Sequence, residues 1–351
     1  MLLRRGLLVA GLVSLVLGVM AGLHRLGFTS AAGAWLAPWH GVVMTGGFAG
    51  LLISLERAVA LDELWALGAP VLVLAGTVGF LLGLPSAPWA YALAGVWAVA
   101  VQVRLARRRV DAASVVMALG TFAWALGMWV FASGGDLASA MLLWAAFPVL
   151  VIAGERLELA FQVRPGGIPW WVFQISVGLV LVGALLSSRD VLLGARLEAV
   201  GFFGLALWML RYDILKRGFK HEGLARYTSL ALWTGYVWLA VGAIFLWQWA
   251  SGASIFWDAA IHSVFLGFMF AMIFAHAPVI FPALTGVKMR WHRGHYVHLV
   301  LLSLGLAIRC SAAFNGSAWL KRHGSLCAAL ALVVFLINQA LSIYLARRKQ
   351  E

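Results

Sequence analysis

The most constraining feature of this sequence is a series of twelve apolar runs, each long enough to cross a lipid bilayer. A transmembrane helix needs about 20 mostly apolar residues. Backbone polar groups inside a bilayer must be satisfied within the helix itself. The sequence therefore predicts an all-α, polytopic membrane bundle of about twelve helices, forming a single transmembrane domain over 1–351. The runs cover 6–23, 37–55, 64–84, 88–104, 112–133, 138–155, 169–187, 191–211, 228–250, 255–281, 296–314 and 326–346.

The composition excludes several classes of protein. The chain is 63% hydrophobic and 11% charged, whereas a soluble domain carries about 25% charged residues. Secreted enzymes, nucleic-acid-binding domains and disordered tails are excluded on this ground. The formal charge of +13 comes from basic residues in short loops between the runs, where such residues set topology. We therefore expect membrane lipids as partners and no nucleic acid.

The basic residues also predict an orientation. Lys and Arg concentrate on the cytoplasmic side of a membrane protein, and 20 of the 26 here fall in alternate loops that share one side with both termini. The first run follows Arg4 and Arg5, as in a signal peptide, but no small-residue cleavage site precedes His24, so we expect a retained helix. The sequence predicts a multi-pass inner-membrane protein with cytoplasmic N- and C-termini.

A short string recurs at the cytoplasmic ends of two runs. The second run ends in Ile-x-x-Glu56-Arg57, and the sixth ends in Ile-x-x-Glu155-Arg156. The tenth run, four further along, carries His276 at a comparable depth. A pseudo-threefold repeat of four helices explains this spacing, and chance agreement of short strings is the alternative.

Two histidines lie at similar depth near the outer ends of their runs, His40 in the second run and His262 in the tenth. Ionisable residues inside a bilayer are costly and mark functional sites by default. Each histidine precedes a stretch with glycines, which allow either close helix packing or a flat slot for a macrocycle. The pair can be a metal or haem site, or two helix-to-helix hydrogen bonds. The glycines are Gly41, Gly46, Gly47 and Gly50 after His40, and Gly267 after His262.

These segments carry a resemblance to known membrane proteins. The stretch from His40 to Gly50, and that from His262 through Gly267 and Met272 to Gly286, resemble the NnrS family of haem and copper membrane proteins of nitric oxide metabolism. More distantly, twelve helices with histidines on the second and tenth resemble the catalytic subunit of haem-copper oxidases.

The resemblance implies a cofactor and its surroundings. It implies a low-spin haem, b-type, held by His40 and His262 with Met44, Gly47 and Gly267 around it. It also implies a redox partner, copper as a second metal, and a role in electron transfer or nitric oxide response. The sequence departs from the oxidases because the runs 138–155 and 169–187, which correspond to their copper-binding helices, contain no histidine. Dioxygen reduction is therefore not expected. Since imidazoles on both faces would close the iron to substrate, we expect electron transfer or haem handling, and whether the chain is an enzyme stays open.

A second group of polar residues is expected at the inner face. His276 lies 14 residues after His262, which is about 21 Å along a helix, so it cannot share that metal. One reading is a structural network of Glu56, Arg57, Glu155 and Arg156. The other is a metal site at His276, or a proton-coupled small-molecule or metal transporter that uses His276, Glu56 and Glu155. Pro278 and Pro282 predict a bent or unwound inner end of this run.

The remaining candidates are weaker. His292, His295 and His298 have a spacing that suits copper or zinc, but their basic neighbours favour solvated loop residues. Cys310 and Cys327 are either a disulfide closing an outer loop or two small apolar residues at helix ends.

Overall fold

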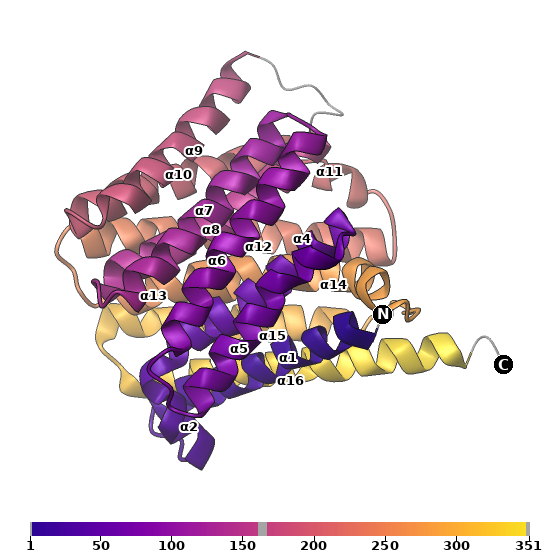
Figure 1. Ribbon diagram of the computed structural model, residues 1–351, viewed down its shortest axis with the longest axis horizontal. Coiled ribbons are helices and arrows are strands. Elements are labelled where there is room, and N and C mark those ends of the chain that lie inside the picture. The colour runs from indigo at the N-terminus through magenta and orange to yellow at the C-terminus, as the bar shows by residue number, and fades with distance from the viewer. Residues whose placement is uncertain (1, 161–166, 349–351) are drawn as a thin grey trace. The chain divides into compact units, whose positions relative to one another are not determined.

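A computed structural model describes residues 2–160 and 167–348 of the chain (Figure 1). Helices make up nearly all of these residues, and twelve of the described helical segments are long and apolar enough to cross a membrane. The predicted all-α bundle of twelve spans is therefore confirmed. The spans run Leu2–His24, Ala31–Leu61, Leu64–Leu81, Ala87–Arg108, Ala112–Ala132, Leu137–Ala160, Pro169–Leu186, Val191–Tyr212, Leu224–Ala250, Phe256–Thr285, His295–Asn315 and Ala318–Arg347.

The chain divides into two compact units, Met1–Gly154 and Glu155–Glu351. Each holds about half of the spans. Whether the units act as the one domain predicted over 1–351 stays a prediction, and so does the threefold repeat.

The first unit contains six spans, some of them interrupted. Here α1 packs against α2 and the irregular segment of the second span, while α6 packs against α5 and α7. Its elements are α1 (Leu2–His24), α2 (Ala31–Leu36), η1 (Ala37–Trp39), α3 (His40–Val42), η2 (Val43–Gly50), α4 (Leu51–Leu61), η3 (Leu64–Leu67), α5 (Gly68–Leu81), α6 (Ala87–Arg108), α7 (Ala112–Ala132) and the greater part of α8 (Leu137–Ala160).

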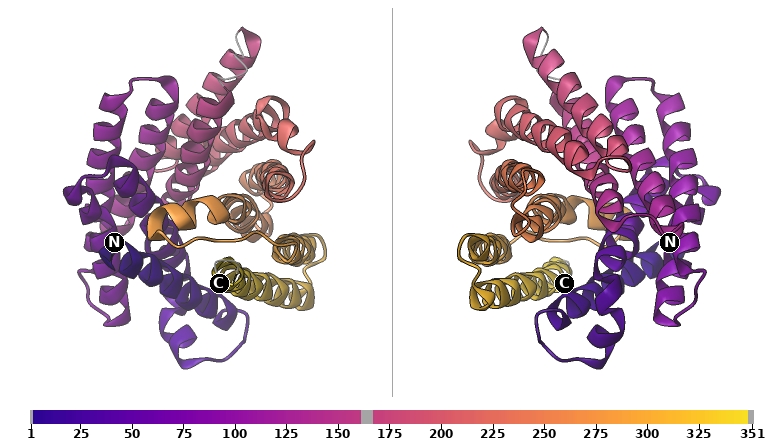
Figure 2. Two further views of the ribbon diagram at one scale, coloured as in Figure 1. Left: turned by 90° about the vertical axis from the view of Figure 1, so that its right-hand side faces the viewer. Right: turned by 90° about the vertical axis from the view of Figure 1, so that its left-hand side faces the viewer.

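The second unit consists mainly of long helices that run side by side, seen nearly end-on in Figure 2. Within it, α9 packs against α10, α10 against α12, and α15 against α16. Its elements after α8 are α9 (Ile168–Leu186), α10 (Val191–Tyr212), α11 (Leu215–Gly218), α12 (Leu224–Ala250), α13 (Phe256–His262), η5 (Ser263–Met269), α14 (Phe270–Thr285), α15 (His295–Asn315) and α16 (Ala318–Arg347).

Local sequence signals set several helix ends. The Asp190 carboxylate accepts from the backbone N–H groups of Leu192 and Leu193 and so caps α10, as an N-cap residue does. Gly286 and Gly316 end α14 and α15 with φ of 70° and 67°, a left-handed conformation that glycine adopts without steric cost.

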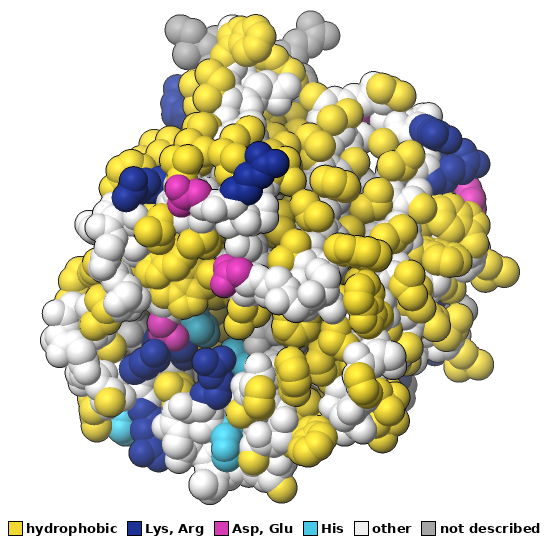
Figure 3. Space-filling view, turned by 60° about the vertical axis from the view of Figure 1, so that its left-hand side comes forward, with side chains coloured by type: hydrophobic (Ala, Val, Ile, Leu, Met, Phe, Trp, Pro, Cys, Tyr) yellow, Lys and Arg dark blue, Asp and Glu magenta, His cyan; other side chains and the backbone are white. Residues whose placement is uncertain are grey.

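The surface of the described residues is that of a membrane protein. Many large apolar side chains stay exposed, among them Trp171, Val279 and Val300. Figure 3 shows hydrophobic side chains over much of one face, with charged side chains in small groups. A soluble protein rarely exposes so much contiguous apolar surface, whereas lipid tails solvate it.

Two spans contain a π-helix. This form is rare in proteins overall, and where it occurs it is often at a functional site. In the second span η2 covers Val43–Gly50, and in the tenth span η5 covers Ser263–Met269. Of the bent or unwound inner end predicted at Pro278 and Pro282, the unwinding is wrong, because α14 continues through both prolines to Thr285, and the bend stays a prediction. The irregular part of the tenth span lies instead directly after His262.

Candidate functional site

His40 begins the helical turn before η2, and its ring is held by α1. Its Nδ1 lies 2.7 Å from the carbonyl oxygen of Gly18. A carbonyl can only accept, so Nδ1 carries the proton and Nε2 is the ring nitrogen with the lone pair. The ring packs on Gly22, where a Cβ atom would lie 2.7 Å from Cε1 of His40. Gly22 thus leaves the room that the imidazole occupies.

His262 ends α13, directly before η5, and carries its proton on the same nitrogen. Its Nδ1 lies 2.8 Å from the carbonyl oxygen of Asp258, one turn earlier in the same helix. The Asp258 carboxylate is also close, with Oδ1 3.6 Å from Nδ1. Nε2 of His262 is therefore the nitrogen with the lone pair, as in His40.

These two histidines share the properties of a metal-binding imidazole. A ligating histidine almost always donates its second ring N–H to a carbonyl or a carboxylate, which fixes the tautomer and the ring orientation. The hydrogen bond of His262 is not specific by itself, since His323 donates to Trp319 in the same way. The contact from His40 to Gly18 joins two helices, which is also the helix-to-helix hydrogen bond expected as the alternative to a metal site.

The predicted cofactor contacts have packing partners inside their own units. The Met44 side chain packs on Gly18, at the place where a Cβ atom on Gly18 would meet the Met44 sulfur. A Cβ on Gly47 would lie 2.9 Å from the Tyr91 hydroxyl, and one on Gly267 would lie 2.6 Å from Cβ of Trp238. Of the two readings of these glycines, close helix packing accounts for the described contacts. As haem contacts, Met44, Gly47 and Gly267 stay predictions.

The other glycines of the second span also serve packing. Gly46 packs on the Tyr91 ring, and Gly50 on the Trp124 indole, which would lie 2.3 Å from a Cβ there. Gly41 has only an ordinary contact with Met141. The glycines of η2 therefore let large aromatic side chains approach the helix backbone.

His276 is half-buried and belongs to a polar network in the second unit. Nη2 of Arg156 donates to Nε2 of His276 over 2.9 Å, and Nδ1 of His276 donates to the carbonyl of Met272 over 2.7 Å. Arg156 also interacts with the Tyr236 hydroxyl, which donates to the carboxylate of Asp213. The lone pair of His276 already accepts from a guanidinium, so a metal at His276 would have to displace Arg156.

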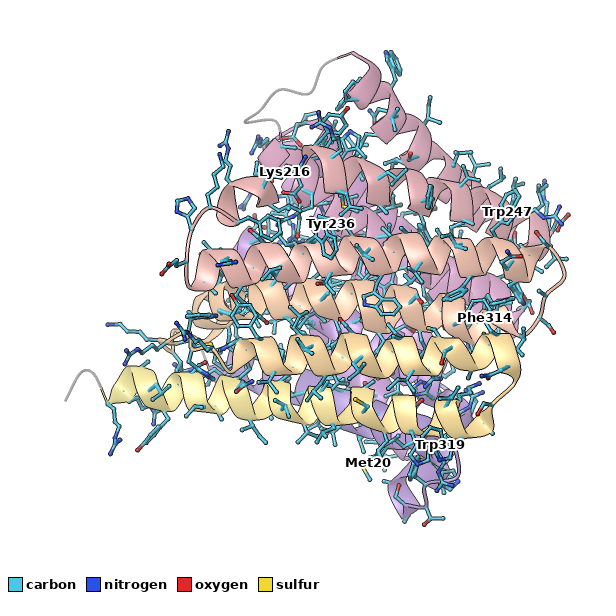
Figure 4. The ribbon with its side chains drawn as sticks, turned by 180° about the vertical axis from the view of Figure 1, so that it is seen from behind. Met20, Lys216, Tyr236, Trp247, Phe314 and Trp319 are labelled. Carbon is cyan, nitrogen blue, oxygen red and sulfur yellow. The ribbon has the colours of Figure 1, made fainter. Side chains whose placement is uncertain are left out.

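Figure 4 shows where this network lies in the second unit. Tyr236 is among the helices, toward the end of the unit that carries Lys216, while Trp247 and Phe314 lie toward the opposite end. Tyr236 and Asp213 are both buried. The network thus joins Asp213 at the end of α10 and Arg156 near the end of α8 to Tyr236 at the middle of α12.

The residues of the predicted structural network divide between the two units, Glu56 and Arg57 in the first and Glu155 and Arg156 in the second. The contacts of each pair are therefore given within its own unit. In the first unit, Nη2 of Arg57 lies 2.8 Å from Oε1 of Glu56, and Nη1 donates to the sulfur of Met117. In the second unit, Arg156 has the contacts given above, and Glu155 is half-buried. The pairing of Arg57 with Glu56 fits the structural reading, and the place of Glu155 in the network stays a prediction.

The interpretation of His292, His295 and His298 as solvated loop residues is wrong for two of the three. His295 and His298 are fully buried at the start of α15. Nε2 of His298 lies 2.9 Å from the Tyr227 hydroxyl, and its Nδ1 lies 3.0 Å from Nδ2 of Asn338. A turn and a helix start fold these residues inward, which their basic neighbours did not indicate. Over the described residues no group of three or more His, Cys, Asp or Glu is arranged to hold a metal ion.

Two polar features escaped the sequence analysis. Glu198 in α10 is fully buried, and neither carboxylate oxygen has a hydrogen-bond partner among the residues that the structure describes. A lone glutamate within an apolar run was the available signal. Asp258 forms ion pairs with Arg309 and Lys321, two of the few basic residues predicted on the outer side. Arg309 and Lys321 are exceptions to the charge bias, and these exceptions could have pointed to Asp258.

The two cysteines are free thiols. Cys310 is buried with its sulfur 3.7 Å from the Ser263 hydroxyl, and Cys327 donates to the carbonyl of Leu301. Their helices hold them as small packed side chains, which was the alternative to a disulfide.

Comparison with known proteins places the chain in a family. No curated protein and no solved structure matches it. Residues 4–344 match the model of a family described as a domain of unknown function (DUF8744). Because this match covers nearly the whole chain, the protein belongs to that family.

Proposed function

We propose that the protein binds a b-type haem in the membrane, with His40 and His262 as axial ligands, and that it functions in electron transfer. The observation that carries the proposal is the common setting of the two imidazoles. Each has its proton fixed on Nδ1 by a backbone carbonyl and directly or closely precedes a π-helix. Neutral imidazole with its lone pair on Nε2 is a good ligand for haem iron.

The residues of the chain have distinct parts in this proposal. Gly18 and Gly22 of α1 would hold the His40 ring, and Asp258 would hold the ring of His262. A bound haem would supply a one-electron couple, and His40 and His262 would be the residues that hold it. A function in nitric oxide response follows only from the resemblance to the NnrS family. Copper is outside the proposal, since no described contact supports it.

The test is an optical spectrum of the protein purified in mild detergent from cells supplied with haem. We expect a reduced spectrum with the sharp bands of a low-spin haem and a pyridine haemochrome of the b type. His40→Ala and His262→Ala should each lose or convert these bands. His323→Ala is the matched control, because His323 has the same type of Nδ1 bond but lies at an exposed position. Well-folded protein without haem would overturn the proposal.

A second candidate function is proton-coupled transport, favoured by the polar network of Arg156, His276, Tyr236 and Asp213. Buried ionisable groups mark proton and ion paths in membrane proteins. If the purified protein carries no haem, proteoliposomes with a pH-sensitive dye should show proton flux that Asp213→Asn abolishes. Equal flux in empty liposomes and in proteoliposomes would reject this candidate.

A further inference from the structure

The outer end of the tenth span holds an ion-pair cluster around Asp258. Nε and Nη2 of Arg309 lie 3.1 and 2.9 Å from the two carboxylate oxygens, a two-bond fork. Nζ of Lys321 lies 3.3 Å from Oδ1. Arg309 also donates to the Ser325 hydroxyl. Side chains from α15 and α16 thus fix the carboxylate of α13 in one orientation.

The fixed carboxylate faces the imidazole of His262. Oδ1 is 3.6 Å from Nδ1, and the Asp258 carbonyl accepts the proton of that nitrogen over 2.8 Å. The Arg309 side chain is only 9% exposed, whereas those of Asp258 and Lys321 are 30% and 38% exposed, so water screens the fork with Arg309 less than the pair with Lys321. The Nδ1 bond of His40 goes instead to the backbone of Gly18.

We propose that Asp258 is a positioning residue for His262: its carboxylate and carbonyl hold the proton on Nδ1 and raise the electron-donating power of Nε2. A negative charge behind a ligating imidazole makes it a stronger ligand. It also favours the more positive, oxidised state of a metal bound in front. The effect on a bound metal rests on the proposed function. The effect on the Nδ1 proton does not, because the tautomer of His262 exists with or without haem.

The charges of the cluster give opposite expectations for its members. Asp258→Asn removes a negative charge and leaves Arg309 and Lys321 uncompensated, so a bound haem should become easier to reduce. Lys321→Met removes a positive charge and should make it harder to reduce. If Asp258 and Lys321 only held the helices together, the two substitutions would not shift the midpoint potential of a bound haem in opposite directions.

The first experiment is independent of haem. Protein is prepared from cells without haem supply and with nitrogen-15-labelled histidine, and the His262 signal is assigned by its loss in His262→Gln. We expect the shift pattern of a ring protonated on Nδ1 in both proteins, because the Asp258 carbonyl is kept, and a displaced Nδ1 signal in Asp258→Asn, because the charged carboxylate is lost. An Nδ1 signal at the same position in Asp258→Asn as in the wild type would overturn the positioning role. A wild-type protein that binds no haem would overturn the proposed function, and this result for the His262 ring would still stand.

The second experiment measures the midpoint potential of the haem-loaded protein. We expect Asp258→Asn to change the oxidation equilibrium about tenfold, which is 59 mV upward for one electron, and Lys321→Met to shift it downward. Asp190→Asn is the matched control, because Asp190 is an exposed outer carboxylate that only caps α10. If Asp258→Asn unfolds, Asp258→Glu and Lys321→Met still give the comparison. Equal potentials in the wild type, Asp258→Glu and Lys321→Met would contradict the inference.

Discussion

His40 and His262 reach the same chemical state by different routes. In the first unit, the acceptor for Nδ1 is Gly18, 22 residues away on another helix. In the second unit, the acceptor is Asp258, one turn away on the same helix, with its carboxylate tied to two neighbouring helices. One tautomer is fixed by a helix contact and the other by the helix itself. Perturbing α1 should therefore affect only His40, and perturbing the ion-pair cluster should affect only His262.

The largest expected effect comes from Gly22→Val. Its side chain would meet the His40 ring, since even a Cβ lies 2.7 Å from Cε1. Overpacking together with the lost hydrogen bond should destabilise the first unit by about 2–3 kcal/mol. Hydrogen exchange followed by mass spectrometry reads the two units separately, and faster exchange is expected in α1 and η2 only. Gly6→Val is the control, because nothing lies within 4 Å of a Cβ there. Equal exchange in both variants would mean that α1 does not hold His40.

Arg309→Met tests the second route. It removes the fork on Asp258, whose side chain is 30% exposed, so we expect a loss of about 2 kcal/mol, less than for a fully buried pair. The same exchange measurement should show the change in α13, α15 and α16. Arg4→Met is the matched control, since Asp62, the partner of Arg4, is 78% exposed and its pair is worth below ~1 kcal/mol. A similar loss in both variants would remove the distinction between the two ion pairs.

Glu198 sharpens the comparison because it is a buried carboxyl without the partners that Asp258 has. Replacing an unpartnered buried polar group by an apolar one of similar size removes a desolvation cost, so Glu198→Leu should raise stability by about 1 kcal/mol. Thermal unfolding in detergent measures it. Asp213→Leu should instead lower stability, because it leaves the Tyr236 hydroxyl and the Leu215 N–H without their acceptor. A lower midpoint in Glu198→Leu would indicate that Glu198 has a partner outside the chain.

The smallest expected effect is a pH dependence in the loop after the second span, the span that carries His40. The hydrogen bond from Trp65 lowers the pKa of Glu63 below 4.5, with further lowering by Arg108 and Arg104 and an opposing effect of burial. A lowered folded pKa adds stability above the unfolded value, and that stability is lost as the pH falls through the folded value. The free energy of unfolding should therefore fall less steeply between pH 6 and pH 3 for Glu63→Gln than for the wild type. Parallel curves would show that Glu63 is not held in the folded state.

Much of the fold followed from the sequence. Apolar runs between charge clusters predict spans because each span satisfies its own backbone, and this local rule located all twelve. His40 and His262 lie in the second and tenth spans, as the sequence predicted, and their common depth in a membrane stays a prediction. Capping residues and terminal glycines mark the ends of α10, α14 and α15 for the same local reason.

Other features were decided by tertiary structure. The sequence could not give the π-helices after His40 and His262, because an extra residue per turn costs local energy that only packing of neighbours such as Tyr91 and Trp238 offsets. It also could not give the partner of each ring nitrogen, the burial of His295 and His298, or the link of Arg156 to His276 across 120 residues. Each of these depends on which helices lie side by side. In a chain whose spans are all apolar, hydropathy says where a helix crosses the membrane but not which neighbours it meets.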